Sequence, residues 1–301
     1  GVEPLPRRLL PELSMGDALH ESWQSLLKRA ARLNPLLRLT AKRAALIFAQ
    51  TPATRDYLPR YAQKKTRILP AIGFSVDVDD TGSADSTGCQ RATNSRTHSG
   101  LHVLSVGRLI HIKGFALGLK AFAVLSQRMP DCTYTIIGDG PKKRALQRLA
   151  ERLDIDERVR FCGGLPHAEV LETMQAADVL LQPSFRDPPA SSVMEAMAMG
   201  TPVVCLDSGG PAWQVTAETG IKVAVSTPDR TVSGLAAALI DLAQNAALRS
   251  ALGRAAQHRV REHCDWEAKG QQVNEMYHEI RRQIIHQKVR KTGHQTMSQT
   301  V

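Results

Sequence analysis

The amino-acid sequence predicts an α/β fold built on a Rossmann-like, doubly wound parallel sheet. Six short apolar segments alternate with segments of helical periodicity. The apolar segments are almost continuously hydrophobic, which is typical of parallel strands that are buried on both faces. Glycines follow most of these segments at the point where the chain leaves the strand. The expected strands are residues 101–107, 134–138, 158–163, 177–184, 202–207 and 221–225.

The intervening segments have the length and spacing of helices that cover such a sheet. Only a Gly-rich turn is expected after the strand at 202–207, and a long amphipathic helix with a basic end is expected over 266–292. The other expected helices are residues 115–129, 141–153, 167–176, 191–199, 229–245 and 246–263.

The part before residue 77 is shorter. Residues 17–43 are mostly helical in pattern, and Thr51-Pro52 has the residue types of a helix cap and first position, between strands at 44–50 and 66–73. This strand–helix–strand pattern is typical of the end of an α/β domain whose beginning is absent. Gly, Ser, Thr and Asp dominate the following segment. We therefore expect four parts: a truncated domain at 1–76, a linker at 77–100, a complete ligand domain at 101–265, and a helix with a basic tail at 266–301.

The composition is that of a globular protein. The 301 residues are 43% hydrophobic and 23% charged, which excludes a mainly disordered chain, a collagen or a coiled coil. No apolar run reaches the ~18 residues of a membrane-spanning helix. The chain begins at Gly1 without a signal sequence, and we interpret it as a fragment. Five widely spaced cysteines without a C-x-x-C pair favour packing or surface thiols in a reducing, cytoplasmic compartment, rather than disulfides or zinc.

The net charge of +10 lies at the two ends. Residues 1–76 hold 13 Lys or Arg against 5 Asp or Glu, residues 77–265 hold 20 against 21, and residues 266–301 hold 6 against 3. Basic ends suit an anionic membrane surface or nucleic acid, and solvated helix faces explain them equally well. Aromatic residues are only 4% and do not interleave with the basic clusters, which argues against nucleic acid as a partner.

The residues that can carry chemistry follow the expected strands. In a doubly wound sheet, ligands bind beyond the carboxyl ends of the strands. Arg108 and Lys113 can neutralise a diphosphate there, although cations after a strand are commonly just solvated. Glu195, near the start of an apolar helix, can bind two ribose hydroxyls or simply complement the helix dipole. The loops also contain Gly107, Gly138 and Gly164, which let backbone N–H groups approach a ligand.

Four stretches in the expected order carry a specific resemblance. They are GRLIHIKGFALGLKAF, TIIGDGPKKRALQRLA, RVRFCGGLPHAEVLETMQAADVLLQPS and MEAMAMGTPVV. Residues 101–225 resemble the donor domain of GT-B glycosyltransferases, specifically the retaining family 4 group (glycosyl transferases group 1). Residues 44–76 resemble the end of the N-terminal acceptor domain of that family. The resemblance implies a GT-B fold with a complete C-terminal domain and a truncated N-terminal domain.

The resemblance also implies roles for individual residues. Arg108 and Lys113 match the catalytic pair that holds the donor diphosphate and stabilises the leaving nucleotide. Glu195 matches the second carboxylate of the E-x7-E pattern, which binds the ribose, and Asp187 matches the first, which contacts the donor sugar. Residues 161–164, with Cys162 and Gly164, match the segment that lines the nucleobase. The remaining residues expected to bind the donor are Gly107, Gly138, Ser191 and Ser192.

Two departures from the family pattern concern the sugar site. The first carboxylate is Asp187 rather than Glu, and Pro188-Pro189-Ala190 replaces a Gly-Phe-Gly-like segment. The prolines remove two backbone donors, but the N–H groups of residues 191–193 can still serve a phosphate. LDSGGP followed by QVT is similar to a bacterial subgroup that also has Asp at the first position.

We therefore expect an enzyme (EC 2.4, hexosyltransferase type) that moves a sugar from a nucleotide diphosphate sugar to an acceptor hydroxyl with retention. The resemblance implies bacterial polysaccharide, lipopolysaccharide or glycolipid synthesis with a glycan or lipid-linked acceptor. The basic N-terminal segment suits a peripheral contact with anionic lipid at the cytoplasmic face of the inner membrane. No D-x-D set of metal ligands stands out and Arg108 with Lys113 can replace the charge of a metal ion, so no metal or cofactor is expected. The fragment alone is not expected to complete the reaction. Two alternatives stay open: a noncatalytic nucleotide-sugar binding module and a GT-B UDP-sugar epimerase.

Overall fold

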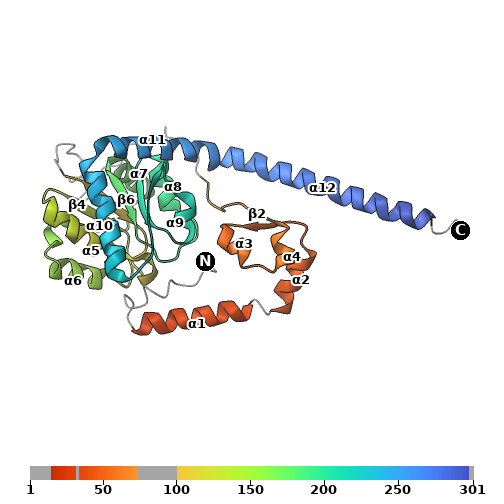
Figure 1. The fold of residues 1–301 in the computed structure, drawn as a ribbon, viewed down its shortest axis with the longest axis horizontal. Coiled ribbons are helices and arrows are strands. Elements are labelled where there is room, and N and C mark those ends of the chain that lie inside the picture. The colour runs from red at the N-terminus through yellow and green to blue at the C-terminus, as the bar shows by residue number, and fades with distance from the viewer. Residues whose placement is uncertain (1–14, 32–33, 74–99, 298–301) are drawn as a thin grey trace.

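The computed structural model describes residues 15–31, 34–73 and 100–297. Figure 1 shows an α/β lobe, a smaller unit formed by the N-terminal elements, and a long C-terminal helix that extends beyond both. The lobe contains a sheet of six parallel strands. Almost all of the predicted linker lies outside the described residues.

The six predicted strands are all present, which confirms the expected fold class. Their order in the sheet is β5-β4-β3-β6-β7-β8, so the order reverses between β3 and β6. The two strands pair in parallel, with Val103 opposite Val179. The bounds are β3 His102–Val106, β4 Thr133–Ile137, β5 Val159–Gly163, β6 Val179–Gln182, β7 Val203–Leu206 and β8 Gly220–Val223.

Alternate residues along the central strands enter two separate hydrophobic cores. In β6, Leu181 packs in one core and Leu180 in the other. This is the physical reason that these strands are apolar at every position. The first core contains α5 (Phe115–Arg128), α6 (Lys143–Arg152) and α10 (Pro228–Gln244). The second contains α7 (His167–Ala176), α8 (Ser191–Ala198) and α11 (Ala246–His263).

One α-helix of the lobe was not predicted. The Gly-rich segment after β7 forms α9 (Gly209–Gln214). Two glycines and a proline have poor intrinsic helix propensity, so the sequence pattern favours a turn here. Tertiary contacts described below hold this short helix against the loop after β6. Two 3-10 turns, η4 (His111–Lys113) and η5 (Asp156–Arg158), complete the lobe.

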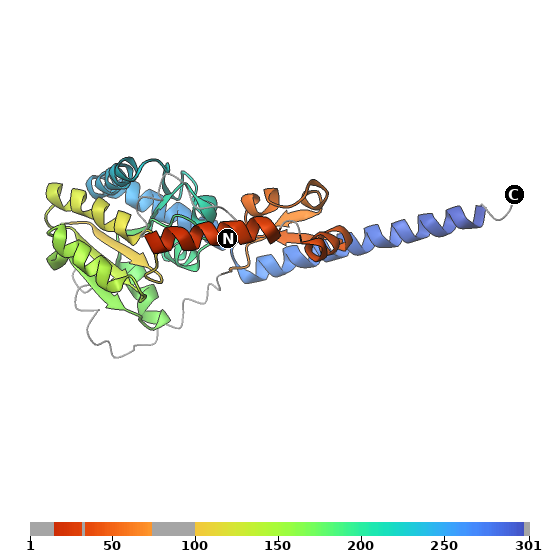
Figure 2. The same cartoon turned by 90° about the horizontal axis from the view of Figure 1, so that it is seen from below.

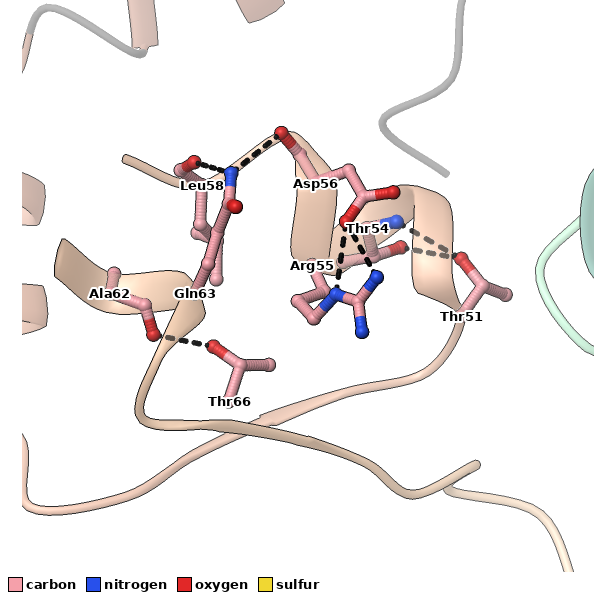
Figure 3. A network of polar contacts seen from close by, with 8 residues as sticks. All are labelled: Thr51, Thr54, Arg55, Asp56, Leu58, Ala62, Gln63 and Thr66. Atoms are coloured by element: carbon pink, nitrogen blue, oxygen red, sulfur yellow. Dashed lines mark hydrogen bonds and ion pairs between the residues drawn. The ribbon is translucent and has the colours of Figure 1, made fainter. Parts of the chain in front are cut away.

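The smaller unit confirms the predicted strand–helix–strand pattern. Strands β1 (Ile47–Ala49) and β2 (Thr66–Ile68) pair in parallel. Between them lie α3 (Pro52–Asp56) and α4 (Arg60–Gln63), and before them α1 (Met15–Ala31) and α2 (Pro35–Arg43). Thr51 caps α3 as predicted, because its Oγ1 accepts a hydrogen bond from the Thr54 amide at 3.1 Å (Figure 3).

The same close-up shows how side chains stabilise the short helices of this unit (Figure 3). Gln63 Nε2 donates to the backbone oxygens of Leu58 (2.7 Å) and Asp56 (3.2 Å). Thr66 Oγ1 donates to the Ala62 oxygen at 2.8 Å. These bonds satisfy carbonyls that such short helices leave without intrahelical partners.

The C-terminal helix α12 (Trp266–Met297) begins against the lobe and runs alongside the smaller unit (Figures 1 and 2). Its Lys269 is buried and donates from Nζ to the backbone oxygens of Pro70 and Ile72, which ties the helix to the chain after β2. Burial lowers the pKa of Lys269. Within the described ranges no single helix is long and apolar enough to cross a membrane, although α10 and α11 reach that length and apolarity together across a 103° bend.

The first core predicts a large effect for Phe122, which is fully buried and packs against the Tyr134 ring at a centroid distance of 5.3 Å. Replacing Phe122 by Ala removes an aromatic side chain and leaves a cavity, so we expect a loss of about 3–5 kcal/mol in unfolding free energy. Chemical denaturation measures this loss. Gln127→Ala on the exposed side of the same helix is the control and should change stability by less than about 0.5 kcal/mol. Equal effects of the two substitutions would contradict the assigned packing.

Candidate functional site

A cleft opens at the carboxyl edge of the sheet, where the strand order reverses. The loops after β3 and β6 leave the sheet on either side of this point. They border a cavity of about 440 Å³. Six of the residues predicted to bind or act on a donor line it: Gly107, Lys113, Asp187, Ser191, Ser192 and Glu195. The other lining residues are Val106, Leu165, His167, Val170, Pro188, Pro189 and Ala190.

The central contact of the cleft is an ion pair between the two loops. Lys113 Nζ lies 2.7 Å from Asp187 Oδ2. The Asp187 side chain is 6% exposed and that of Lys113 is 19% exposed. The same carboxylate oxygen accepts from Gln182 Nε2 at 3.3 Å, and Gln182 is buried at the end of β6. In this structure Asp187 therefore balances the charge of Lys113.

Backbone contacts hold the two loops together. The Phe185 amide donates to the Ile112 oxygen at 2.9 Å. Gly114, the N-cap residue of α5, lies where the two loops meet and adopts the left-handed conformation (φ 66°). A Cβ added to Gly114 would lie 2.0 Å from the backbone oxygen of Pro183. Only glycine combines this backbone angle with so close an approach. Gly114 therefore positions Lys113 next to the loop that carries Asp187.

The Pro188-Pro189 segment is supported by the Gly-rich helix α9. The Gly210 amide donates to the backbone carbonyl oxygen of Asp187 at 2.7 Å. Gly209 adopts φ 67° beside the same backbone. A Cβ on Gly210 would lie 2.1 Å from the Pro189 nitrogen. These contacts explain why α9 forms despite its composition. They also fix the backbone around Asp187, where the prolines offer no N–H groups.

The first turn of α8 faces the cleft through Ser191 and Ser192. Its N-cap residue is Ala190, and no side chain caps the helix. The Gln214 side chain instead makes two hydrogen bonds to the backbone of Ala190. Oε1 of Gln214 accepts from the Ala190 amide at 2.8 Å, and Nε2 donates to the Ala190 carbonyl oxygen at 3.0 Å. The N–H groups at the start of α8 are therefore held in place and can bind an anion.

Glu195 lies one turn further along α8 and also lines the cavity. Its side chain is 15% exposed, and Oε1 lies 3.4 Å from Nε2 of the exposed His167. His167 begins α7 and was not predicted as a site residue. Its position depends on the loop after β5, which sequence spacing alone does not orient.

The remaining predicted residues lie around the cleft rather than in its lining. Arg108 is exposed at the start of the loop after β3. Gly138 lies between neighbouring strand ends, because its amide donates to the Gly163 oxygen at 2.6 Å and a Cβ would lie 2.1 Å from the Gly107 oxygen. Gly164 is exposed, with open space around its Cα.

Cys162 corrects one expectation. It is disulfide-bonded, so the prediction of thiols throughout is wrong at this position. The other cysteines that the structure describes, Cys132, Cys205 and Cys264, are free. Wide sequence spacing argues against a disulfide framework, but a single bond depends on tertiary proximity, which spacing does not give. Through 15–31, 34–73 and 100–297, no group of three or more His, Cys, Asp or Glu side chains is arranged to hold a metal ion.

The lobe is similar to a family of known proteins. Residues 90–259 match the family model described as "Glycosyl transferases group 1". The chain is 30% identical over 175 residues to a 2-deoxystreptamine glucosyltransferase of Streptomyces kanamyceticus, a match that covers 58% of this chain and 45% of that protein. It is also 30% identical over 237 residues to a D-inositol 3-phosphate glycosyltransferase of Streptomyces avermitilis, covering 75% and 50%. The chain thus spans about half the length of the curated relatives it matches.

The fold of the chain is similar to that of solved structures. Sucrose-phosphate synthase of Thermosynechococcus elongatus has a TM-score of 0.63 and 26% identity, and the match covers 80% of this chain and 59% of that one. HepE of Anabaena in complex with UDP and glucose has a TM-score of 0.66 at 21% identity, covering 80% and 65%, which shows likeness of fold alone.

The geometry at Gly114 yields a stability prediction. A Gly114→Ala substitution forces an alanine into the left-handed region and against the Pro183 oxygen, so we expect a loss of about 1–3 kcal/mol in unfolding free energy. Thermal unfolding measures it. Gly164→Ala is the matched control, since its φ is ordinary and its Cβ meets nothing within 4 Å. A Gly114→Ala protein as stable as this control would contradict the described close approach.

Proposed function

The chain belongs to the glycosyl transferases group 1 family, and we propose that its cleft binds a nucleotide diphosphate sugar and transfers the sugar to an acceptor hydroxyl. The lobe has the GT-B fold class, as its parallel sheet and structural neighbours show. The observation that carries the proposal is the meeting of a cation, an uncapped helix N-terminus and a carboxylate in one cavity, namely Lys113, α8 and Glu195. Matched relatives are named as glycosyltransferases, which favours transfer over the binding-module and epimerase alternatives.

The anionic part of the donor fits the cationic side of the cleft. The Lys113 ammonium and the N–H groups of Ser191 and Ser192 supply positive charge and hydrogen-bond donors, which suit a diphosphate. Arg108 is exposed at the start of the same loop and would add a second cation. Charge that develops on the β-phosphate as the glycosidic bond breaks would be stabilised by Arg108 and Lys113 together, so no metal ion is required.

Asp187 has two partners in this proposal. Without donor it balances Lys113 at 2.7 Å. When a diphosphate takes over Lys113, the Asp187 carboxylate is free to accept hydrogen bonds from hydroxyls of the donor sugar. The exchange limits the cost of donor binding, because Lys113 is paired before and after it. Gln182, Gly210 and Gln214 act as positioning residues for Asp187 and for the start of α8.

Glu195 is proposed to bind the ribose through its two carboxylate oxygens. His167 Nε2 lies 3.4 Å from Glu195 Oε1, and a bound ribose can displace it because the His167 side chain is 67% exposed. Gly138, Cys162 and Gly164 mark the strand ends where the nucleobase would lie against backbone groups. Retention at the anomeric carbon and membership of family 4 complete the proposal, and both follow from the resemblance of the motifs.

The donor assignment predicts separable effects on binding. Lys113→Ala should lose about 1.5–3 kcal/mol of diphosphate affinity, the usual value of a charge-assisted hydrogen bond, and Arg108→Ala should act in the same direction. Glu195→Gln should weaken nucleosides as well as nucleotides, whereas Asp187→Asn should weaken only sugar-bearing donors. Thermal unfolding against UDP, GDP, ADP and their sugar conjugates measures these changes, since a ligand at 100 times its Kd adds about 2.7 kcal/mol.

Arg144→Ala is the control for these cation variants, because Arg144 is exposed on α6 away from the cavity lining. It should leave nucleotide affinity unchanged. Unchanged affinity in both Arg108→Ala and Lys113→Ala would overturn the assignment of the diphosphate site.

The proposed acceptor is a glycan or a lipid-linked sugar of a bacterial envelope pathway, reached at the cytoplasmic face of the membrane. Helix α2 supports this part, because Leu36, Leu37 and Leu39 are exposed while Lys42 and Arg43 lie in its last turn. Exposed leucines beside cations suit an anionic lipid surface.

The membrane proposal predicts salt-dependent binding to anionic vesicles. The chain should co-sediment with vesicles containing phosphatidylglycerol at low salt and be released as salt rises, because each nearby cation contributes about 1 kcal/mol. Neutral phosphatidylcholine vesicles are the control. Equal binding to both kinds of vesicle, or none to either, would contradict an electrostatic contact.

A further inference from the structure

Helix α1 contacts the lobe through its acidic face. Asp17 and Glu21, one turn apart, both reach the loops at the rim of the cleft. The large apolar side chains of α1 whose burial the structure describes are exposed: Leu19, Trp23, Leu26 and Leu27. Amphipathic helices usually bury their apolar face, so the charged contact is the unusual feature here. Among the described residues, the docking of α1 on the rim depends on charge.

The carboxylates of Asp17 and Glu21 contact three basic side chains, each from a different loop. Arg186 Nη1 lies 2.8 Å from Glu21 Oε2. His111 Nε2 lies 3.0 Å from Glu21 Oε1, and its Nδ1 lies 3.3 Å from Asp17 Oδ1. Lys142 contacts the other oxygen of Asp17. Both ring nitrogens of His111 therefore face carboxylate oxygens of α1.

The central pair of this cluster is buried, which distinguishes it from a solvated surface cluster. Glu21 is 3% exposed and Arg186 is 5% exposed. Burial opposes ionisation of Glu21, yet the hydrogen bond from His111 and the charge of Arg186 outweigh it and lower the pKa of the carboxyl. Glu21 Oε2 and Arg186 Nη1 nevertheless make no well-aligned hydrogen bond, despite their short separation. The carboxylate thus satisfies the charge of Arg186 but not its donor geometry.

The cluster lies beside the donor cleft, but none of its residues lines that cleft. Arg186 directly precedes Asp187, and His111 is two residues before Lys113. Lys142 comes from the loop after β4. A phosphate group offers three oxygens in a tetrahedral arrangement, which matches converging donors from three loops better than a planar carboxylate does.

We propose that His111, Lys142 and Arg186 form a second anion site beside the donor cleft, that this site takes a phosphate group, and that Asp17 and Glu21 of α1 occupy it from within the chain. Phosphate and α1 then exclude each other, so a bound phosphate displaces α1 from the rim. The site stands on the geometry of these five residues and does not depend on the proposed transfer reaction. If that reaction holds, the phosphate belongs to the acceptor side, since the donor diphosphate takes Lys113.

The test measures binding of inorganic phosphate by calorimetry, at constant ionic strength with chloride as the balancing anion. The variant Asp17→Asn/Glu21→Gln, made in the full chain, removes the internal anions and should bind phosphate at least about 10-fold more tightly than the unmodified chain, a gain of about 1.4 kcal/mol. Adding His111→Gln and Lys142→Gln should abolish the gain. Adding Lys113→Ala instead should preserve it.

Asp241→Asn/Glu275→Gln is the matched control, because it removes the same charge from exposed positions on α10 and α12. It should leave phosphate affinity unchanged. The proposal is overturned if the α1 variant shows no gain, if the control shows the same gain, or if the gain is lost with Lys113→Ala. Glycerol 3-phosphate in parallel distinguishes the source: an equal gain assigns the site to phosphate esters, and a gain for inorganic phosphate alone assigns it to the free ion.

A second measurement uses the unmodified chain and so does not depend on the folding of variants. Hydrogen exchange over residues 15–31 should speed up in phosphate more than in chloride at equal ionic strength, because helices in proteins owe most of their stability to tertiary contacts, which displacement removes. Equal exchange in the two salts would indicate screening without a site and would overturn the proposal.

Discussion

The reversal of strand order between β3 and β6 is the constraint on which the rest of the structure depends. At this point neighbouring parallel strands send their loops in opposite directions, which opens a cleft at the carboxyl edge of the sheet. Lys113 follows β3 and Asp187 follows β6, so the ion pair that joins them at 2.7 Å spans the reversal itself. The two apolar cores hold the strands in place, and backbone contacts between the loops, such as that of the Phe185 amide with the Ile112 oxygen, bring these two side chains together.

Backbone contacts, more than side-chain packing, shape the walls of the cleft. Gly114 and Gly210 let loops approach within distances that no Cβ permits, and Gln214 holds the N-cap residue of α8 by two hydrogen bonds. As a result the start of α8 points its N–H groups at a fixed place without a capping side chain. A site of this kind is ready for an anion before the anion arrives, which lowers the ordering cost of binding.

The rim carries two groups of basic side chains, which differ in the carboxylates that they contact. Lys113 is balanced by Asp187 from its own lobe, whereas His111, Lys142 and Arg186 are balanced by carboxylates of α1. Both arrangements keep buried charges paired, since an unpaired buried charge is strongly destabilising. They differ in consequence, because exchanging Asp187 for a ligand is a local event, whereas exchanging Asp17 and Glu21 releases a whole helix.

The sequence by itself determined the six strands, nearly all the helices and the loops that carry the candidate site, because hydrophobic periodicity and glycine placement are local signals. Lys113, Asp187, Ser191, Ser192 and Glu195 were predicted for the cleft and line one cavity. Only the tertiary structure decided the helix at Gly209–Gln214, the disulfide at Cys162, the hydrogen bonds of Gln214 to Ala190 and the docking of α1. The contacts of Gln214 and of α1 join segments that are distant in the chain, and α9 overrides a weak local propensity. Such contacts follow from which surfaces meet, and the spacing of residues does not encode that.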